Sequence, residues 1–320
     1  MKTPLTIQLI VKNNEETIDF FLESIAPLGC NIIAADLGCK DGTIKKLENK
    51  NATIIKTLNY EDMSKVRNKL ILEINSEWIL HLEPYETLIS DSKIIKEAIK
   101  GPPSSFNFGV LQGDMLTRQT RLWHKSLNLS YVNPIYETIE RKSNFMNFFI
   151  NVNKFQPQVD VKSIAKNWHD KNPLLADATY YVACNELISK NWDAFINFAD
   201  LYLHQQKKQT MSYFMIQYYM AMVQCYIKKN YQIALQRISM CVLKNPTLAE
   251  FWCLLGDIFY AIKQYDKSYC FYENAKIIGS RRLQECDWPM EISKYHDYPT
   301  KMMESCRKIL NNTQTYLSNQ

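Results

Sequence analysis

The first half of the chain alternates short apolar runs with stretches whose apolar residues recur at helical spacing. Runs typical of buried strands occupy residues 5–11, 30–36, 52–56 and 77–82. Helical spacing between them predicts helices at residues 15–28, up to about 47, and at 63–74. Repeated strand–helix–strand units form mostly parallel sheets with helices on both faces. The pattern therefore predicts an α/β, Rossmann-like domain, to which β-like runs after residue 103 add antiparallel edge strands that complete a cleft.

From about residue 174 this alternation ends and helical patterns dominate. Aligning residues 218–246 with 252–280 matches Tyr231 to Tyr265 at a separation of 34 residues, which is the period of tetratricopeptide repeats. The later segment carries side chains at the spacing typical of this repeat, namely Trp252, Leu255, Gly256, Phe259, Tyr272 and Ala275.

A more degenerate unit at residues 183–203 brings the number of repeats near the three that a stable stack needs. The stretch from 288 to 316 fits a capping helix. We therefore expect two domains, an α/β domain at 1–172 and an all-α tetratricopeptide-repeat domain at 173–320. An unrelated helical bundle is the alternative for the second domain.

The composition agrees with two globular domains and narrows the class of partner. The chain has 320 residues, of which 46% are hydrophobic and 22% charged. Its formal charge of +5 is spread along the length without a basic run, so it indicates neither nucleic acid nor an anionic membrane. No stretch approaches the roughly 18 apolar residues of a membrane span. The nine cysteines form no C-x-x-C pair, which predicts reduced thiols and a cytoplasmic location.

Polar residues follow three of the expected strands, at 12–16, 36–43 and 83–86. Ligands of open α/β sheets bind beyond the carboxyl ends of the strands, so these segments are candidate site loops. Asp36 can accept hydrogen bonds from a nucleobase or a ribose hydroxyl, and Gly38 and Gly42 permit a tight turn beside it. Asp41 is either part of the same site or a cap of the next helix.

Three further residues have both a functional and a structural interpretation. Arg67 lies beside the apolar face of the helix at 63–74, so it either lies on the surface or turns its guanidinium toward phosphates. Glu137 follows a proline turn among apolar residues and is either a general base or a solvated glutamate. His169 is a candidate metal or phosphate ligand, although a lone histidine is more often structural.

These residues, in this order, resemble the family-two glycosyltransferases of the GT-A fold that carry C-terminal tetratricopeptide repeats, a branch that includes the sublancin-type S-glycosyltransferases. The resemblance covers nearly the whole chain. Its matching segments are QLIVKNNEET at 8–17, NIIAADLGCKDGT at 31–43, MSKVRNKLILEINSEWILHLEPYE at 63–86, RLWHKSLNLSYVNPIYET at 121–138 and WHDKN at 168–172.

The resemblance implies an inverting transfer of a sugar from a nucleotide diphosphate sugar, UDP-linked, with Mn²⁺ or Mg²⁺. It implies that Asp36 holds the base or ribose, with the backbone from Val11 to Asn13 beside it. Arg67 would lie near the donor, Glu137 would act as base or orient the acceptor, and His169 would face the metal and diphosphate. The repeats would present a peptide, protein or glycan acceptor, and a homodimer is left open.

The sequence departs from the family at the motif after the fourth strand. Members carry Leu-Asp-Ala-Asp-Glu there, whereas this chain has Leu82, Glu83, Pro84, Tyr85 and Glu86. Tyr85 thus stands where an aspartate binds the metal that bridges the donor diphosphate, and a phenol is a poor ligand for a hard cation.

This departure leaves two routes for the chemistry and two classes of function. Glu83 and Glu86 can hold the metal instead, or cations such as Arg67, Lys12 and His169 can neutralise the diphosphate. The first class of function is an active glycosyltransferase. The second is a catalytically degenerate glycosyltransferase-like protein whose repeats bind a partner.

Overall fold

The computed structural model describes residues 4–57, 61–139, 141, 143–154, 159–282 and 288–318. The chain divides into two compact units, Met1–Trp168 and His169–Gln320. The border falls inside helix α5 (Val161–Lys171), close to the boundary at 172 that the sequence predicts.

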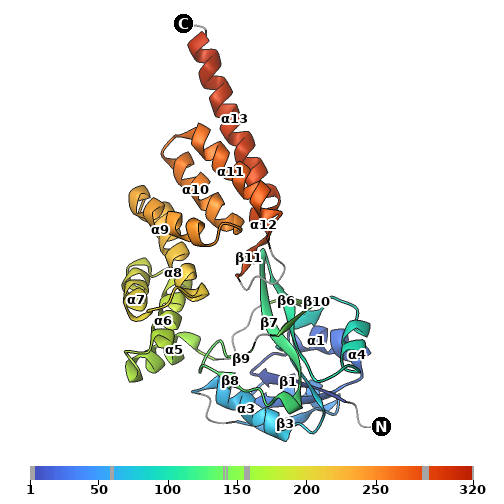
Figure 1. Ribbon diagram of the computed structural model, residues 1–320. Coiled ribbons are helices and arrows are strands. Elements are labelled where there is room, and N and C mark those ends of the chain that lie inside the picture. Colours follow the sequence, from blue (N-terminus) through green and yellow to red (C-terminus); the bar gives the residue numbers. More distant parts are fainter. Residues whose placement is uncertain are drawn as a thin grey trace. The chain divides into compact units, whose positions relative to one another are not determined.

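A mixed, mostly parallel sheet forms the centre of the first unit (Figure 1). Its parallel half has the order β3–β2–β1–β4 and consists of β1 (Leu5–Val11), β2 (Asn31–Asp36), β3 (Thr53–Lys56) and β4 (Trp78–His81). The sheet continues through β7 (Met115–His124), β6 (Ser105–Gln112), β10 (Asn144–Val152) and β5 (Glu86–Leu88). The α/β fold class is therefore confirmed. The expected edge position of β6 and β7 is wrong, because β7 pairs with β4 and β6 pairs with both β7 and β10.

Helices cover both faces of this sheet because its central strands alternate two apolar faces. Leu9 of β1 packs in one core with Phe21 of α1, whereas Ile10 packs in another with Leu70 of α3. The first core is covered by α1 (Ile18–Ile25), the 3₁₀ turn η1 (Ala26–Leu28), α2 (Thr43–Glu48) and α4 (Lys93–Ala98), and the second by α3 (Met63–Glu73). Both faces of the parallel strands are therefore removed from water, as all-parallel pairing requires.

A small hairpin is fixed against α3 by backbone groups. After the 3₁₀ turn η2 (Lys125–Leu127), the hairpin consists of β8 (Tyr131–Val132) and β9 (Thr138–Ile139). The Asn68 side chain accepts from the Tyr131 N–H at 2.8 Å and donates to the Tyr131 carbonyl at 2.9 Å. The Met63 N–H donates to the Pro134 carbonyl at 2.8 Å. These bonds hold the hairpin loop at the start of α3.

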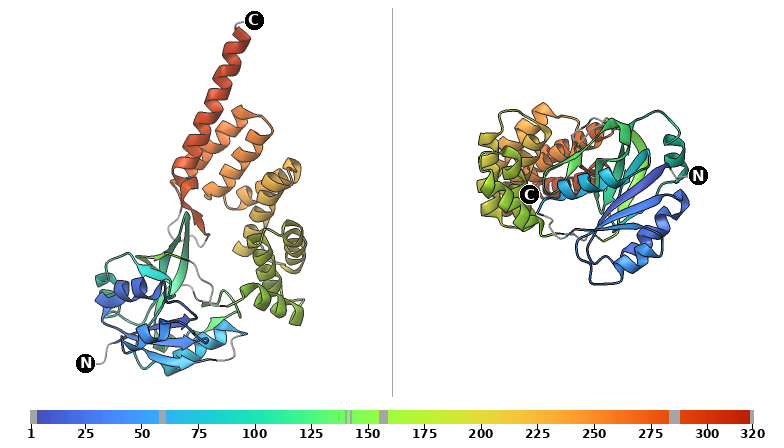
Figure 2. Two further views of the ribbon diagram at one scale, coloured as in Figure 1. Left: turned by 180° about the vertical axis from the view of Figure 1, so that it is seen from behind. Right: turned by 90° about the horizontal axis from the view of Figure 1, so that it is seen from below.

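The second unit consists of successive antiparallel helix pairs (Figure 2), which confirms the predicted all-α class. After α5 come α6 (Ala176–Ile188), α7 (Trp192–Gln205), α8 (Met211–Met222) with a π-helical turn, η3 (Val223–Ile227), α9 (Tyr231–Lys244), α10 (Ala249–Ala261) and α11 (Tyr265–Gly279). The expected capping region contains β11 (Met290–Glu291), α12 (Ile292–Tyr295) and α13 (Asp297–Ser318).

The turns inside the three helix pairs share one backbone conformation. Lys190, Lys229 and Lys263 precede the second helix of each pair and have φ angles of 59°, 56° and 62°. Close packing within the last pair requires a glycine, since a Cβ at Gly256 would lie 2.6 Å from the Tyr272 ring. Because Lys190 lies within it, the degenerate unit at 183–203 shares the turn geometry of the two clearer repeats.

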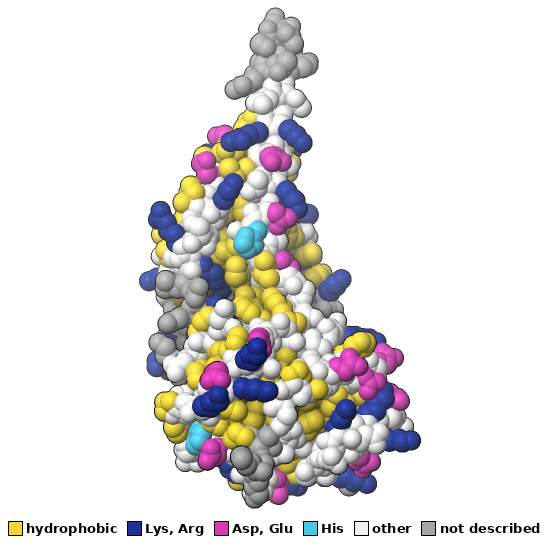
Figure 3. Space-filling view, turned by 90° about the vertical axis from the view of Figure 1, so that its right-hand side faces the viewer, with side chains coloured by type: hydrophobic (Ala, Val, Ile, Leu, Met, Phe, Trp, Pro, Cys, Tyr) yellow, Lys and Arg dark blue, Asp and Glu magenta, His cyan; other side chains and the backbone are white. Residues whose placement is uncertain are grey.

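The distribution of charge on the surface does not favour one class of binding partner over another. Figure 3 shows Lys and Arg side chains interspersed with Asp and Glu over the face that it views. Within the part of the chain that the structure describes, no helix is both long and apolar enough to cross a membrane.

A buried carboxylate anchors the segments that follow α11. Glu250 of α10 is fully buried and accepts hydrogen bonds from Arg282, from the Tyr295 hydroxyl and from the Glu291 N–H. Burial raises the pKa of Glu250 to about 7, although Tyr295 and Arg282 oppose that rise. The carboxyl thus titrates near neutral pH.

Glu250 predicts a pH dependence of stability. The folded chain holds a proton on Glu250 that the unfolded chain releases at its ordinary pKa of 4.5. The contribution of Glu250 is therefore fully present below about pH 4 and is lost as the pH rises toward 7, by up to about 3 kcal/mol. Urea unfolding of wild type and Glu250→Gln at pH 5 and pH 8 measures it. The variant is expected to lose less stability between the two pH values, and equal losses would contradict the assignment.

Candidate functional site

Asp36 lies where the strand order places a ligand, at the carboxyl end of β2. It is buried and pairs in register with Val11 at the end of β1. Its Oδ1 accepts the backbone N–H groups of Gly38 at 2.9 Å and Cys39 at 2.7 Å, in a turn where Gly38 has a φ of 91°. The turn fixes the direction of the carboxylate and uses one of its two oxygens.

The loops after β1 and β2 are joined by side chains. Asn13, whose φ is 55°, accepts the Lys40 N–H at 2.7 Å. Asp41 accepts the Glu15 N–H at 3.0 Å and the Thr43 N–H at 3.1 Å. Partial burial would raise the pKa of Asp41, but the hydrogen bonds from Thr43 and Glu15 outweigh it and lower the pKa. Asp41 thus binds the first N–H of α2, whose N-cap is Gly42, and these contacts join the two loops into one rim.

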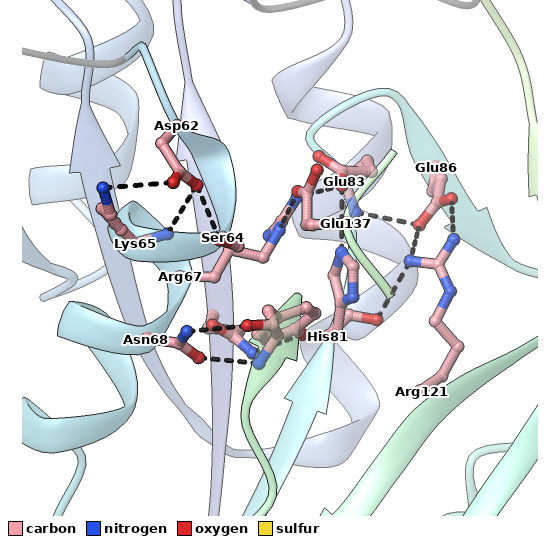
Figure 4. A network of polar contacts seen from close by, with 12 residues as sticks. Asp62, Ser64, Lys65, Arg67, Asn68, His81, Glu83, Glu86, Arg121 and Glu137 are labelled. Atoms are coloured by element: carbon pink, nitrogen blue, oxygen red, sulfur yellow. Dashed lines mark hydrogen bonds and ion pairs between the residues drawn. The ribbon is translucent and has the colours of Figure 1, made fainter. Parts of the chain in front are cut away.

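Arg67 is the centre of a buried ionic network (Figure 4). Its side chain is 2% exposed, its Nε donates to Oε1 of Glu137, and its Nη2 donates to Oε1 of Glu83. Burial opposes the charged form, but the carboxylates of Glu83 and Glu137 raise the pKa of Arg67. The guanidinium therefore lies away from the surface, with Nε and Nη2 engaged by carboxylates. It joins α3 to the turn after β4 and to the hairpin loop.

The loop that carries Glu137 is strained. Asn133 and Tyr136 have φ angles of 71° and 48°, a left-handed conformation that is uncommon for side chains such as tyrosine. Such strain persists only where surrounding contacts impose it, and it concentrates at functional sites. The contacts of Glu137 with Arg67 and of Pro134 with Met63 supply that constraint here.

His81 is part of the network although the sequence analysis did not select it. Its Nε2 lies 2.9 Å from Oε1 of Glu83. Burial, together with the charges of Arg67 and Arg121, lowers the pKa of His81 well below its ordinary value. The neutral ring therefore donates a hydrogen bond to Glu83 rather than forming an ion pair with it.

Two further polar residues complete the face of the sheet toward α3. Gln8 is fully buried beside His81 in the register of β1 and β4, and its Nε2 donates to the Tyr131 hydroxyl at 2.7 Å. The rings of Tyr131 and His81 meet edge to face at 5.5 Å. Burial raises the pKa of Tyr131, so the phenol stays protonated. The sequence pattern did not single out Gln8, His81 or Tyr131 as site residues. Their signal was a polar residue inside an apolar central strand, at position 8 and at position 81.

Glu86 is neutralised by a second arginine. Arg121 of β7 donates from Nη2 to Oε1 at 2.7 Å and from Nη1 to Oε2 at 3.1 Å, and the Glu83 N–H donates to Oε2 at 2.9 Å. Both partners are almost completely buried. Both oxygens of Glu86 are therefore engaged, and the carboxylate closes the turn after β4 instead of facing solvent.

The expected metal ligands belong to different units, Glu83 and Glu86 to the first and His169 to the second. Burial, followed by the charges of Glu83 and Glu86, raises the pKa of Tyr85, so its phenol is protonated at neutral pH. His169 belongs to the second unit, where its Nδ1 lies 3.2 Å from the Thr179 hydroxyl. Among the described residues, no group of three or more His, Cys, Asp and Glu side chains is arranged to hold a metal ion. The metal roles of Glu83, Glu86 and His169 stay predictions.

Comparisons with known proteins give structural likeness only. No family model matches the chain, and no curated protein matches it. It is similar to S. aureus TarS 1-349 in complex with UDP-GlcNAc, with 12% identity over 96% of this chain and 92% of that chain and a TM-score of 0.40. "MamA 41-end" from Desulfovibrio magneticus RS-1 is 17% identical over 49% of this chain and 84% of that chain, with a TM-score of 0.36.

A third solved structure is glucosyl-3-phosphoglycerate synthase from Mycobacterium tuberculosis in complex with Mn²⁺ and UDP-glucose. It is 14% identical over 34% of this chain and 44% of that chain, with a TM-score of 0.29. At these sequence identities and TM-scores the structural similarities do not assign a function to this chain. A proposal for its function has to rest on the contacts within the chain.

Removing one partner of the buried Arg121–Glu86 pair is expected to lower the stability of the fold strongly. Arg121→Met leaves the Glu86 carboxylate buried without its counter-charge, which is expected to destabilise the fold by about 3–5 kcal/mol. The double variant Arg121→Met with Glu86→Gln removes both charges and keeps an acceptor for the Glu83 N–H. Its cost is expected to be clearly smaller. Urea unfolding followed by tryptophan fluorescence measures both, and an Arg121→Met midpoint equal to wild type would refute a buried pair.

Proposed function

We propose that the first unit binds a nucleotide diphosphate sugar, UDP-linked, and transfers its sugar with inversion to a nucleophile of a peptide, protein or glycan. The observation that carries this proposal is the set of fixed acidic side chains beyond the parallel strands. Asp36 ends β2, Glu83 follows β4, and Glu137 is bound to the same arginine as Glu83. Ligands of such sheets bind at this edge.

Asp36 suits recognition of the nucleoside. Its Oδ1 is held by two backbone N–H groups, and a carboxylate has acceptor capacity beyond those two bonds. A nucleobase N–H or a ribose hydroxyl is the donor that this capacity fits. The bound loops around Asn13 and Asp41 would form the rim against which the nucleoside rests.

Glu137 suits the role of base. In the proposed reaction, an acceptor O–H or S–H gives its proton to the carboxylate while its heteroatom forms a bond to the anomeric carbon. The bond from that carbon to the diphosphate breaks, and its electron pair leaves with the diphosphate. Arg67 would orient Glu137 for this step, since its Nε bonds Oε1.

The helical unit suits the binding of a macromolecular acceptor. Ile188 ends α6, Ile227 ends the π-helical turn η3 and Ile262 directly follows α10, and they are 70%, 44% and 37% exposed. Stacked helical repeats form extended surfaces that bind other macromolecules. A homodimer and a cytoplasmic location belong to the same proposal as further expectations.

One observation favours a second candidate, a degenerate glycosyltransferase-like protein that binds a partner through its repeats. Glu83 and Glu86 are both bound by buried arginines, and Tyr85 is a buried phenol between them. This turn therefore offers the donor no carboxylate that is free of a counter-charge.

Nucleotide binding and donor hydrolysis test the proposal. Isothermal titration with UDP, GDP, ADP and CDP is expected to find one that binds, and Asp36→Asn is expected to weaken it by at least about tenfold. This variant keeps an acceptor for the turn. Glu137→Gln is expected to keep nucleotide binding and to slow donor hydrolysis or transfer by about 10²–10⁴-fold.

The matched control is Glu97→Gln, which removes an exposed carboxylate on α4 and is expected to change neither property. Absence of binding to every nucleotide would refute the proposal. Nucleotide binding without donor hydrolysis or transfer would favour the degenerate candidate.

A further inference from the structure

We infer that the guanidinium of Arg67 takes the place of a divalent metal ion between Glu83 and Glu137, so that the site binds a nucleotide diphosphate without metal. This inference deepens the proposed function and rests on it for the identity of the ligand. Its physical basis is the way in which the acidic side chains around the turn after β4 are already occupied.

A divalent cation such as Mn²⁺ or Mg²⁺ needs oxygen ligands that it can share with the diphosphate. Glu86 has no such oxygen, because Arg121 and the Glu83 N–H engage both of its carboxylate oxygens and the side chain is 2% exposed. Tyr85 is buried with a raised pKa, so its phenol keeps its proton. Within the described network, Glu83 and Glu137 are the carboxylates that remain.

Arg67 already bridges these two carboxylates. Nε contacts Glu137, Nη2 contacts Glu83, and the neutral His81 ring donates to the same Glu83 oxygen at 2.9 Å. A planar cation with several donors fits two carboxylates as a bridging metal would, and it carries its charge at every physiological pH. Figure 4 shows the guanidinium lying between Glu83 and Glu137.

A metal ion would have to displace this guanidinium or bind beside it. Displacement would leave a buried arginine without its counter-charges, and binding beside it would place two cations against the same carboxylates. Both are unfavourable where side chains are removed from water. The donor set therefore does not fit a divalent metal.

The same guanidinium keeps a donor for a ligand. Its Nη1 is buried and has no hydrogen-bond partner in the part of the chain that the structure describes, and the same holds for Oε1 of Gln8 and Nε of Arg121. A buried N–H without an acceptor is costly, so an unmade bond of this kind calls for an explanation. A diphosphate oxygen would satisfy Nη1 once the atoms that cover this nitrogen move, and we assign that bond to the nucleotide-bound state.

Titrations of the full chain test the inference directly. Mn²⁺ alone is expected to show no binding tighter than about 1 mM. The dissociation constant of UDP is expected to agree within about twofold in EDTA and in Mn²⁺. Binding of Mn²⁺ alone in the micromolar range, or UDP affinity that rises about tenfold or more with Mn²⁺, would overturn the inference. Failure of every nucleoside diphosphate to bind would count against the proposed function, and the titration with Mn²⁺ alone would still decide the metal question.

The Mn²⁺ affinity of Arg67→Met distinguishes an arginine that occupies the position of a metal ion from one that only stabilises the fold. The substitution frees the carboxylates of Glu83 and Glu137, so the variant is expected to gain Mn²⁺ affinity by at least about tenfold over wild type. Arg67→Lys keeps the charge and is expected to show no gain. Arg141→Met removes an exposed arginine as a control for net charge, and no gain is expected there either. A folded Arg67→Met that binds Mn²⁺ no tighter than wild type contradicts the inference. If that variant does not fold, the wild-type titrations decide the question.

Discussion

The burial of one guanidinium determines how the first unit is assembled. Arg67 is removed from water, and a buried charge is tolerated only when it is paired and hydrogen-bonded. Its partners Glu83 and Glu137 lie 16 and 70 residues away in the sequence. The ion pairs therefore bring the turn after β4 and the hairpin loop to the same end of α3, and the candidate site exists only where these three segments meet.

The polar residues around Arg67 depend on that arrangement and on one another. His81 stays neutral because two arginines and burial disfavour its charged form, and only a neutral ring donates to Glu83 without adding a positive charge. Gln8 is buried in the central strand and donates to Tyr131, whose backbone is held by Asn68 of α3. In a low-dielectric interior such a network specifies one structure when its members are satisfied. Three buried atoms of the described network are exceptions, namely Nη1 of Arg67, Oε1 of Gln8 and Nε of Arg121.

Sequence periodicity was enough to predict the parallel strands, the position of Asp36 at a strand end and the helical repeats, because each depends on local spacing. It did not predict where Arg67 would turn, since the apolar face of α3 is set by Val66 and Leu70 and no pattern inside one helix identifies a carboxylate 70 residues later. It also left β6 and β7 at an edge, because strand order depends on which edge of β4 remains open. His81 was missed for a simpler reason, since one polar residue in a buried strand does not disturb the apolar pattern.

The turns of the helical unit keep this protein below the highest stability that its fold allows. Lys190, Lys229 and Lys263 each adopt a left-handed backbone, which costs an L-residue with a Cβ roughly 1–2 kcal/mol relative to glycine. Because all three lysines are exposed, packing does not require their side chains at these positions. The helical repeats thus hold conformational strain at the same place in every pair. Replacing these lysines with glycine would relieve that strain and raise thermal stability without altering a core contact.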